Sequence, residues 1–464
     1  MKQLQASIQT FVQTLPQSRK RVHLLLGILL LTALLPRVYL LAKVSEKDFL
    51  HNDGGEYMEI SRQLSQGNGF SLSFYRWYEF PRPGQKDMLH KDLSRPPLFP
   101  LLGSLVFFLP VNPLFWAKGI SLLLSLTAIY CVFLLGKEFA GAVCGLFSAA
   151  LFSIYPYALY YTISWSTENL FLILLALSFT FLLKACRGNP SSFPYCGLFL
   201  ALASLTRPTA LPLAFAFIVI WVFFSYKSGS WRVMGKQAAL FLGIFLLLLL
   251  PWTIRNYRVG GKFTPMTYYG SYAFWLSSSD VIYETYRTMD TPDYEKKTGE
   301  LWNRLHAERL AELKEKGAYD IAEASRWWKQ WGLDYIRQNP DKMAYIWKER
   351  FFHYWRMCPN LASLSTTQIV LLRTFFTCLF ILALAGLFLL RKRKETLILL
   401  FPPLFGLVIS IPFLFVLRYR YPFFAPYVCV FAAFVLTWLT RKAVGEELPE
   451  PFSTGEKGLI PSRK

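Results

Sequence analysis

The sequence of 464 residues has no Cys-x-x-Cys pair and no histidines at metal-ligand spacing, although it contains 7 cysteines and 5 histidines. An odd number of scattered cysteines argues against a disulfide framework and a zinc site. No Gly-x-Gly-x-x-Gly loop is present, which argues against a dinucleotide-binding fold. No stretch has the pattern of a β-strand. No internal repeat is found, and this absence weakens a transporter built from two similar halves.

Acidic residues are scarce, with 29 Asp and Glu against 50 Lys and Arg and a formal net charge of +21. The basic residues form short tracts and no stripe, so they indicate loops facing anionic lipid, and no nucleic-acid partner is expected. Charged residues make up only 17% of the chain, whereas 54% is hydrophobic. This composition is too apolar for a soluble globule and too low in charge for a disordered chain. We therefore predict an integral membrane protein surrounded by lipid.

Apolar runs recur between residues 23 and 440, and a helix needs about 20 residues to cross a bilayer. The run 98–109 is interrupted by proline and reaches only about 18 Å as a helix, so it is expected not to cross. Every short basic loop then falls on the side of the N-terminal tail, as the positive-inside rule requires. The prediction is an all-α membrane fold with about ten spans, at 23–42, 119–135, 140–160, 168–183, 193–206, 209–226, 238–254, 369–390, 397–417 and 421–439.

This topology divides the chain into five parts. They are a cytoplasmic tail (1–22), a transmembrane module (23–254) that includes an outer loop (44–116), a large outer loop (255–368), C-terminal transmembrane helices (369–440) and a cytoplasmic tail (441–464). In the large outer loop, Trp327, Trp328, Trp331 and Tyr335 recur at helical spacing. Such aromatic faces are typical of juxtamembrane helices that lie on the membrane, and a separately folded domain is the alternative.

Acidic residues gather directly after the first span, where Asp53, Glu56 and Glu59 follow one another closely. Asp53 stands where a helix is expected to begin, and a helix cap is the purely structural interpretation. A carboxylate at the membrane surface can equally serve as a general base. Glu168 begins a later span on the same outer side, where it either caps the helix or serves a site.

Arginines also stand at outer helix ends, against the expected depletion of cations on that side. Each one alone fits an anchor to lipid headgroups. Arginines that face carboxylates at one membrane surface instead make a site that can bind a phosphate and transfer a proton. The candidates are Arg95, Arg207, Arg255, Arg418 and Arg420.

The order of these motifs resembles the GT-C glycosyltransferases that use polyprenyl-phosphate sugars. That branch includes the aminoarabinose transferase of lipid A and, more distantly, the protein O-mannosyltransferases. The resemblance extends over residues 23–440. The motifs that carry it are Asp53 with Tyr57, Glu59, Ile60, Ser61 and Arg62; Arg95-Pro96-Pro97; Arg207-Pro208-Thr209; Pro251-Trp252 with Arg255-Asn256-Tyr257; and Arg420-Tyr421-Pro422.

The resemblance implies a GT-C-like fold and a catalytic acid at Asp53, with a second acidic residue at Glu168. It also implies phosphate-binding cations at Arg95, Arg207 and Arg420. We add the neighbouring Glu56 to the catalytic candidates and Tyr57, Arg255 and Arg418 to the donor-binding candidates. Many family members have an acid where this chain has Gly54. This difference leaves open whether Glu56 takes part and whether a divalent metal is held, and no other cofactor is expected.

The implied activity is transfer of a sugar, with inversion, from a polyprenyl-phosphate carrier to a glycan, lipid or protein acceptor. The reaction would take place on the outer, periplasmic face of the plasma (inner) membrane, with both termini cytoplasmic. One alternative is a transporter or flippase of lipid-linked glycans, whose charges would line a passage through the bilayer. Another is a polymerase or ligase of the same outer-surface pathway.

Overall fold

The structure is a computed structural model, and it describes residues 18–85, 87–226, 230–289, 291, 293–356, 365–413, 417–443 and 445. Most of the two predicted cytoplasmic tails lies outside the described residues, as does Cys358.

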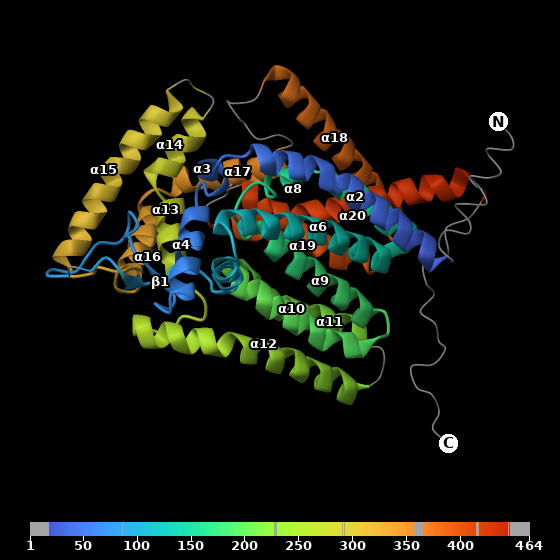
Figure 1. Ribbon diagram of the computed structural model, residues 1–464, viewed down its shortest axis with the longest axis horizontal. Helices are drawn as coiled ribbons and strands as arrows, with labels where there is room; N and C mark the ends of the chain where they lie inside the picture. The colour runs from blue at the N-terminus through green and yellow to red at the C-terminus, as the bar shows by residue number, and fades with distance from the viewer. Residues whose placement is uncertain are drawn as a thin grey trace.

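The described residues are mostly helical, with one short antiparallel pair of strands in the segment between α4 and α5 (Figure 1). In chain order the elements are α2 (Arg19–Lys43), α3 (Glu46–Phe49), α4 (Gly54–Ser65), β1 (Ser71–Leu72), β2 (His90–Lys91), α5 (Leu98–Ser104), η1 (Leu105–Phe108), α6 (Pro113–Ala140), α7 (Ala142–Ser153), α8 (Pro156–Tyr160), α9 (Glu168–Cys186), η2 (Pro190–Ser192), α10 (Phe193–Thr206), η3 (Pro208–Ala210), α11 (Leu213–Ser225), α12 (Trp231–Gly260), α13 (Tyr269–Ser277), α14 (Asp280–Thr288), α15 (Tyr294–Glu315), α16 (Ile321–Gln338), α17 (Pro340–Trp355), α18 (Thr366–Leu389), α19 (Thr396–Ser410) and α20 (Leu417–Ala443).

The predicted all-α membrane fold is confirmed. Within the described residues, 7 helices are long and apolar enough to cross a membrane. They are Arg19–Lys43, Pro113–Ala140, Glu168–Cys186, Pro208–Ser225, Trp231–Gly260, Thr366–Leu389 and Arg418–Ala443. The other predicted spans correspond to the shorter helices α7, α10 and α19, so the count of ten stays a prediction.

The predicted span at 140–160 does not form one continuous helix, because the structure divides it. Helix α7 ends at Ser153, and the short helix α8 begins at Pro156. Proline has no N–H to continue the preceding helix, and it disfavours helical backbone in the residue before it. Tyr155 is accordingly extended, with φ −65° and ψ 122°.

The proline-bounded run 98–109 forms only α5 and one 3-10 turn, and it is not among the helices long enough to cross. Helix α5 packs against α4, where the Ser61 hydroxyl donates to the Pro100 carbonyl at 3.0 Å. Gly103 lies so close to Ser61 and Trp165 that a side chain at this position would collide with both. This close packing holds α5 beside α4.

A buried arginine joins the first span to the bundle. Arg37 lies inside α2, and its guanidinium donates to the Ser125 hydroxyl at 2.8 Å and to the Ser153 carbonyl at 3.0 Å. An unpaired charge among apolar helices is costly, so hydrogen bonds of this kind are needed to keep it there. Arg37 thereby ties α2 to α6 and α7.

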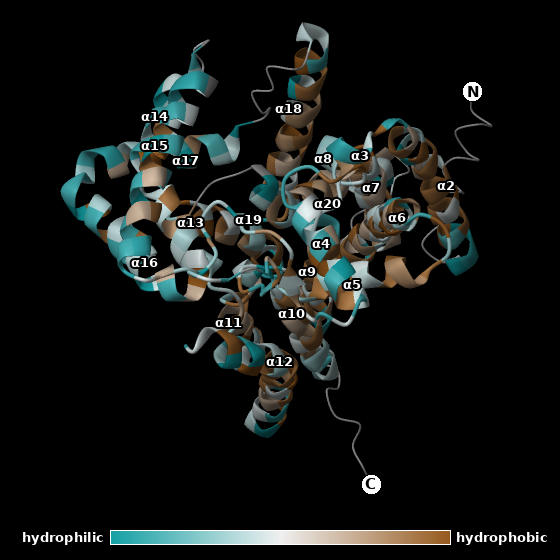
Figure 2. Cartoon of the chain, turned by 60° about the vertical axis from the view of Figure 1, so that its left-hand side comes forward, coloured by the Kyte–Doolittle hydropathy of each residue, from teal (hydrophilic) through white to brown (hydrophobic). Residues whose placement is uncertain are grey.

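Helices α13 to α17 form a unit that stands beside the apolar bundle (Figure 1). Its α14 to α16 helices are largely hydrophilic, whereas α2, α12 and α18 are largely hydrophobic (Figure 2). The aromatic face of α16 is partly turned inward: Trp328 is fully buried, with its ring 4.6 Å from that of Trp275 and 5.1 Å from that of Tyr272. The face that the sequence suggested for lipid contact therefore contributes to the core of this unit, because partners from α13 cover it.

The topology can be tested with single cysteines in a cysteine-free background. An impermeant thiol reagent is expected to label positions 85 and 291 from outside and position 230 from inside, since these residues are exposed and lie on opposite sides in the predicted topology. Gln85 is preferred to its neighbour Gly84, whose φ of +80° disfavours any other residue. Labelling of position 230 from outside only would contradict the predicted topology.

Candidate active site

The side chain of Asp53 binds arginines and does not cap a helix. Asp53 precedes α4, but its side chain makes no capping hydrogen bond. One carboxylate oxygen lies 2.7 Å from an Nη of Arg95, and the other lies 2.7 Å from an Nη of Arg418. The capping interpretation of Asp53 is therefore excluded in favour of an electrostatic one.

Further pairs extend this contact into a continuous group. Glu56 accepts a hydrogen bond from Nε of Arg95 at 2.8 Å. Glu168 accepts one from Arg207 at 2.7 Å, and Nε of Arg418 lies 3.8 Å from the same carboxylate. Arg418 therefore stands between two acids from distant parts of the chain. The acid–arginine cluster is the set Asp53, Glu56, Arg95, Glu168, Arg207 and Arg418.

Helix ends bring the cluster together. Glu168 is the first residue of α9, where the helix dipole favours a negative charge. Arg207 follows the last residue of α10, where the dipole favours a positive charge. Arg95 stands three residues before α5, and Arg418 lies in the first turn of α20. Because these helices end at the same level, charges that are far apart in sequence meet there.

The cluster is most accessible at Asp53 and Arg418. Their side chains are 22% and 28% exposed, whereas those of Glu168 and Arg207 are 3% and 9% exposed. A substrate would therefore reach Asp53 and Arg418 first.

The pKa of Asp53 reflects two opposing influences. Burial is the largest single influence and raises this pKa, but attraction by Arg95 and Arg418, with the hydrogen bond from Arg418, outweighs it. The pKa of the Asp53 carboxyl is therefore held below its ordinary range. A carboxylate in this state is a weak base, and it becomes more basic when an arginine is withdrawn.

Two other candidate residues, Tyr57 and Arg255, have different surroundings. The Tyr57 ring lies 5.4 Å from the guanidinium carbon of Arg95, so Tyr57 borders the cluster. Arg255 donates to the backbone carbonyls of Asp92 and Phe70 at 2.6 and 3.1 Å. It therefore fastens α12 to the segment between α4 and α5, and no ion pair joins it to the cluster acids.

Arg420 is also bound to backbone. Its guanidinium donates to the carbonyls of Tyr354 and Arg356 at 2.6 and 2.8 Å, near the end of α17. Within the described residues no ion pair joins Arg420 to the acids that bind Arg418, although the two arginines are separated by one residue only. A donor-binding role for Arg255 and Arg420 stays a prediction.

The sequence analysis missed two further charged residues, Arg76 and Asp92, that lie next to Glu56 and Arg95. Arg76 donates to Glu56 at 2.7 Å and lies 2.5 Å from Asp92. Asp92 in turn accepts the backbone N–H groups of Ser94 and Arg95 at 3.0 and 2.8 Å. The sequence contained one indication, because an Asp two and three residues before such N–H groups commonly forms this turn. Arg76 also pairs with Glu79, three residues away, at 3.4 Å, but its shorter contacts are to Glu56 and Asp92 in other segments, which the sequence around Arg76 does not indicate.

The described residues contain no group of three or more His, Cys, Asp and Glu side chains placed to hold a metal ion. The carboxylates of the cluster instead face guanidinium groups. These features define a class: a helical membrane protein with a carboxylate–arginine site where its helices end.

Residues 94–254 match the sequence family described as dolichyl-phosphate-mannose-protein mannosyltransferase. This match includes Arg95, Glu168 and Arg207 of the cluster. No curated protein matches the sequence significantly.

Among solved structures, the chain is similar to the oligosaccharyltransferase of Archaeoglobus fulgidus in its apo form. The TM-score is 0.55 and the identity 15%, and the match covers 90% of this chain and 51% of the other. The same archaeal protein, AglB, in complex with an inhibitory peptide and a dolichol-phosphate matches with a TM-score of 0.54 and 16% identity, covering 92% and 51% of the two chains. The present chain thus spans about half the length of that enzyme.

ArnT from Cupriavidus metallidurans in the apo state matches with 14% identity over 90% of this chain and 77% of the other, and its TM-score of 0.39 supports no further conclusion. The family match and the shared fold with the oligosaccharyltransferase confirm the resemblance to GT-C glycosyltransferases that the motifs indicated.

Proposed function

We propose that this protein is a membrane glycosyltransferase that moves a sugar from a polyprenyl-phosphate carrier to a glycan, lipid or protein hydroxyl. The observation that carries this proposal is the acid–arginine cluster at the helix ends. Arginines suit the donor phosphate, and the partly exposed Asp53 suits an acceptor hydroxyl. The match of residues 94–254 to a family named for a lipid-phosphate sugar donor supports the same reaction class.

In the proposed reaction the acceptor oxygen forms a bond to the anomeric carbon as the bond from that carbon to the phosphate oxygen breaks. The acceptor proton moves to the Asp53 carboxylate, and polyprenyl phosphate leaves with the negative charge. Arg95, Arg207 and Arg418 stabilise that charge, because guanidinium groups bind phosphate oxygens well in partly water-excluded sites. Attack from the side opposite the leaving phosphate inverts the anomeric centre.

The arginine contacts indicate how donor binding prepares the base. Asp53 shares Arg95 with Glu56 and Arg418 with Glu168. A donor phosphate that takes up these guanidinium groups competes with the carboxylate of Asp53. Withdrawal of an arginine raises the pKa of Asp53 and makes it a stronger base. Glu56 and Glu168 continue to orient the arginines through their own contacts.

We place the reaction on the outer face of the plasma membrane, with both termini cytoplasmic, because of the distribution of basic loops. The cluster lies where α4, α9, α10 and α20 begin or end, away from the middle of the spans. A transporter or flippase would need charges along a passage through the bilayer. The position of the cluster therefore favours a transferase.

The activity is tested by incubating purified protein with a panel of radiolabelled polyprenyl-phosphate sugars and a membrane extract. We expect one donor to give label in a glycan, lipid or protein product, with release of polyprenyl phosphate. The sugar and the acceptor are identified from the labelled product. Folded protein that transfers label from no donor in a broad panel would contradict the proposal.

The pH dependence of transfer tests the exchange of arginines between Asp53 and the donor. The low pKa of Asp53 keeps its carboxylate ionised in the free protein well below neutral pH. The ratio kcat/KM reports ionisations of the free protein, and kcat reports those of its donor complex. Because the donor phosphate raises the pKa of Asp53, we expect kcat to decline at a higher pH than kcat/KM when the medium is acidified.

Both parameters should be measured with donor varied at saturating acceptor, and each sample should be returned to neutral pH to verify that it has stayed folded. If kcat and kcat/KM declined at the same acidic pH, or if kcat declined at the lower pH, the proposed exchange of arginines between Asp53 and the donor phosphate would be contradicted.

A further inference from the structure

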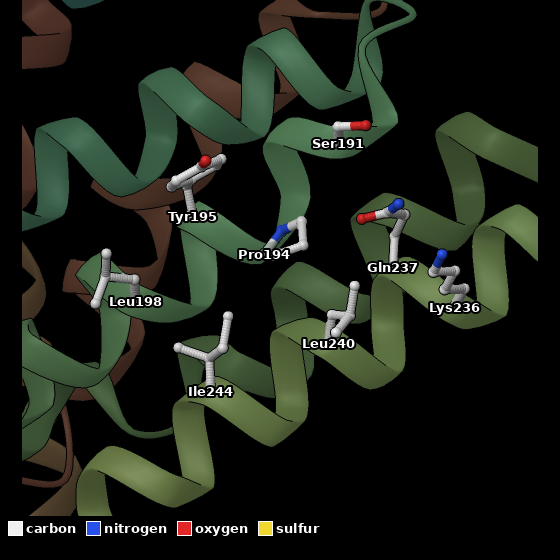
Figure 3. A pocket seen from close by; sticks show the side chains of 8 residues that line it. All are labelled: Ser191, Pro194, Tyr195, Leu198, Lys236, Gln237, Leu240 and Ile244. Atoms are coloured by element: carbon white, nitrogen blue, oxygen red, sulfur yellow. The ribbon is translucent and has the colours of Figure 1, made fainter.

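A groove lies between α10 and α12 (Figure 3). The residues that line it belong to the ends of these helices that are opposite to Arg207 and Arg255. The groove is open and has a volume of about 440 Å³, which falls within the range of ligand sites. Successive turns of both helices line it, so the groove follows the helix pair lengthwise. Its shape is that of a site for an elongated molecule.

The lining changes from polar to apolar along the groove. Ser191, Lys236 and Gln237 lie toward one end, whereas Leu198 and Ile244 lie toward the other (Figure 3). A ligand that fits both ends has a polar head and an apolar tail. Because α12 is a candidate membrane span, it is surrounded by lipid, and a membrane lipid has this combination of polar head and apolar tail.

The charge of the polar end is positive and unopposed. Lys236 and, one turn earlier, Arg232 are both exposed, and neither forms a hydrogen bond or ion pair with another described residue. The sequences of α10 and α12 contain no Asp or Glu. An anionic headgroup would therefore supply the missing counter-charge, and the hydroxyl of Ser191 and the amide of Gln237 could donate hydrogen bonds to its phosphate.

The groove and the acid–arginine cluster belong to opposite membrane faces. The uncharged stretch 238–254 of α12 separates Lys236 from Arg255, and as a helix it measures roughly 25 Å, close to the thickness of the hydrocarbon core. Arg207, at the far end of α10, belongs to the cluster. A lipid with its head at Lys236 therefore belongs to the leaflet opposite the candidate active site.

We propose that this groove binds one anionic phospholipid from that leaflet. Its phosphate lies at Lys236, and one acyl chain lies along Leu198, Leu240 and Ile244. The bound lipid contacts both α10 and α12 at the ends that are opposite to Arg207 and Arg255. This site is separate from the transferase site and does not depend on the proposed activity.

Thermal unfolding of the purified full-length protein in detergent, with added lipid, tests the site. Phosphatidylglycerol is expected to raise Tm more than phosphatidylcholine at equal concentration, because a ligand that binds only the folded state stabilises it. Lys236→Gln should weaken the apparent affinity for phosphatidylglycerol about five-fold, as one lysine near a membrane surface contributes about this factor. Lys392→Gln is the matched control: it removes an exposed cation outside the groove and should leave the affinity unchanged.

A second variant tests the apolar end without changing any charge. Leu240→Trp fills part of the groove and should reduce the Tm increase caused by either phospholipid. Soluble glycerol phosphate should give no comparable increase, because it has no acyl chain. Equal effects of the two phospholipids on the parent protein, an unchanged affinity in Lys236→Gln, or a full effect of glycerol phosphate would each overturn the proposal.

Discussion

Asp53→Asn is expected to lower the turnover of sugar transfer by about 100-fold to 10,000-fold, the usual loss for a positioned general base. Asn keeps the shape of the side chain but cannot accept the acceptor proton. Binding of polyprenyl phosphate should be retained or tightened, because Arg95 and Arg418 lose a competing carboxylate. Turnover is measured with the labelled donor, and binding with the unlabelled lipid phosphate.

The same substitution separates catalysis from stability. Asp53 makes no capping hydrogen bond, so loss of a cap cannot explain a large effect. Glu46→Gln is a suitable control, because it neutralises an exposed acid in the same outer segment and should transfer sugar normally. A folded Asp53→Asn protein with normal turnover would remove Asp53 from the reaction.

Arg418→Gln is expected to lower kcat/KM for the donor by about 10-fold to 100-fold. The estimate corresponds to the loss of a charge-assisted hydrogen bond, worth about 1.5 to 3 kcal/mol. Arg418→Lys should fall between this variant and the parent protein. Its ammonium group keeps the charge but lacks the planar fork that lets Arg418 contact Asp53 and Glu168 together.

A pH profile distinguishes this role from a merely structural one. Without Arg418 the pKa of Asp53 should rise in the free protein, since Arg418 helps to hold it low. The acid limb of kcat/KM should then move to higher pH in Arg418→Gln. Arg287→Lys is the control, because Arg287 forms an exposed pair with Glu284. It should change neither kcat/KM nor the pH of its acid limb. An unshifted limb would mean that Arg418 does not act on Asp53.

The membrane helices were largely predictable because the physical cause is local. A bilayer of fixed thickness requires an uncharged run of about 20 residues, and such runs are visible along the chain. The spans predicted at 23–42, 168–183 and 369–390 accordingly lie within α2, α9 and α18 apart from single terminal residues. The break at Pro156 shows the limit, because hydropathy alone does not register a proline that ends a helix.

The candidate residues of the site were also visible locally, as charges at helix ends beside lipid. Asp53, Arg95, Glu168, Arg207 and Arg418 were all selected for this reason, and the structure brings all five together. The local pattern treated Arg255 and Arg420 in the same way. The local sequence pattern does not indicate which groups from distant segments a guanidinium group contacts in the folded protein.

The sequence by itself determined a helical membrane protein with a small set of charges at one surface. Only the tertiary structure decided which charges are partners. Asp53 and Arg418 meet because the first residues of α4 and α20 come close together, whereas Arg420, two residues beyond Arg418, is held by a carbonyl of α17. Crossing a membrane depends on consecutive residues, but an ion pair depends on the approach of distant segments, which no short stretch of sequence encodes.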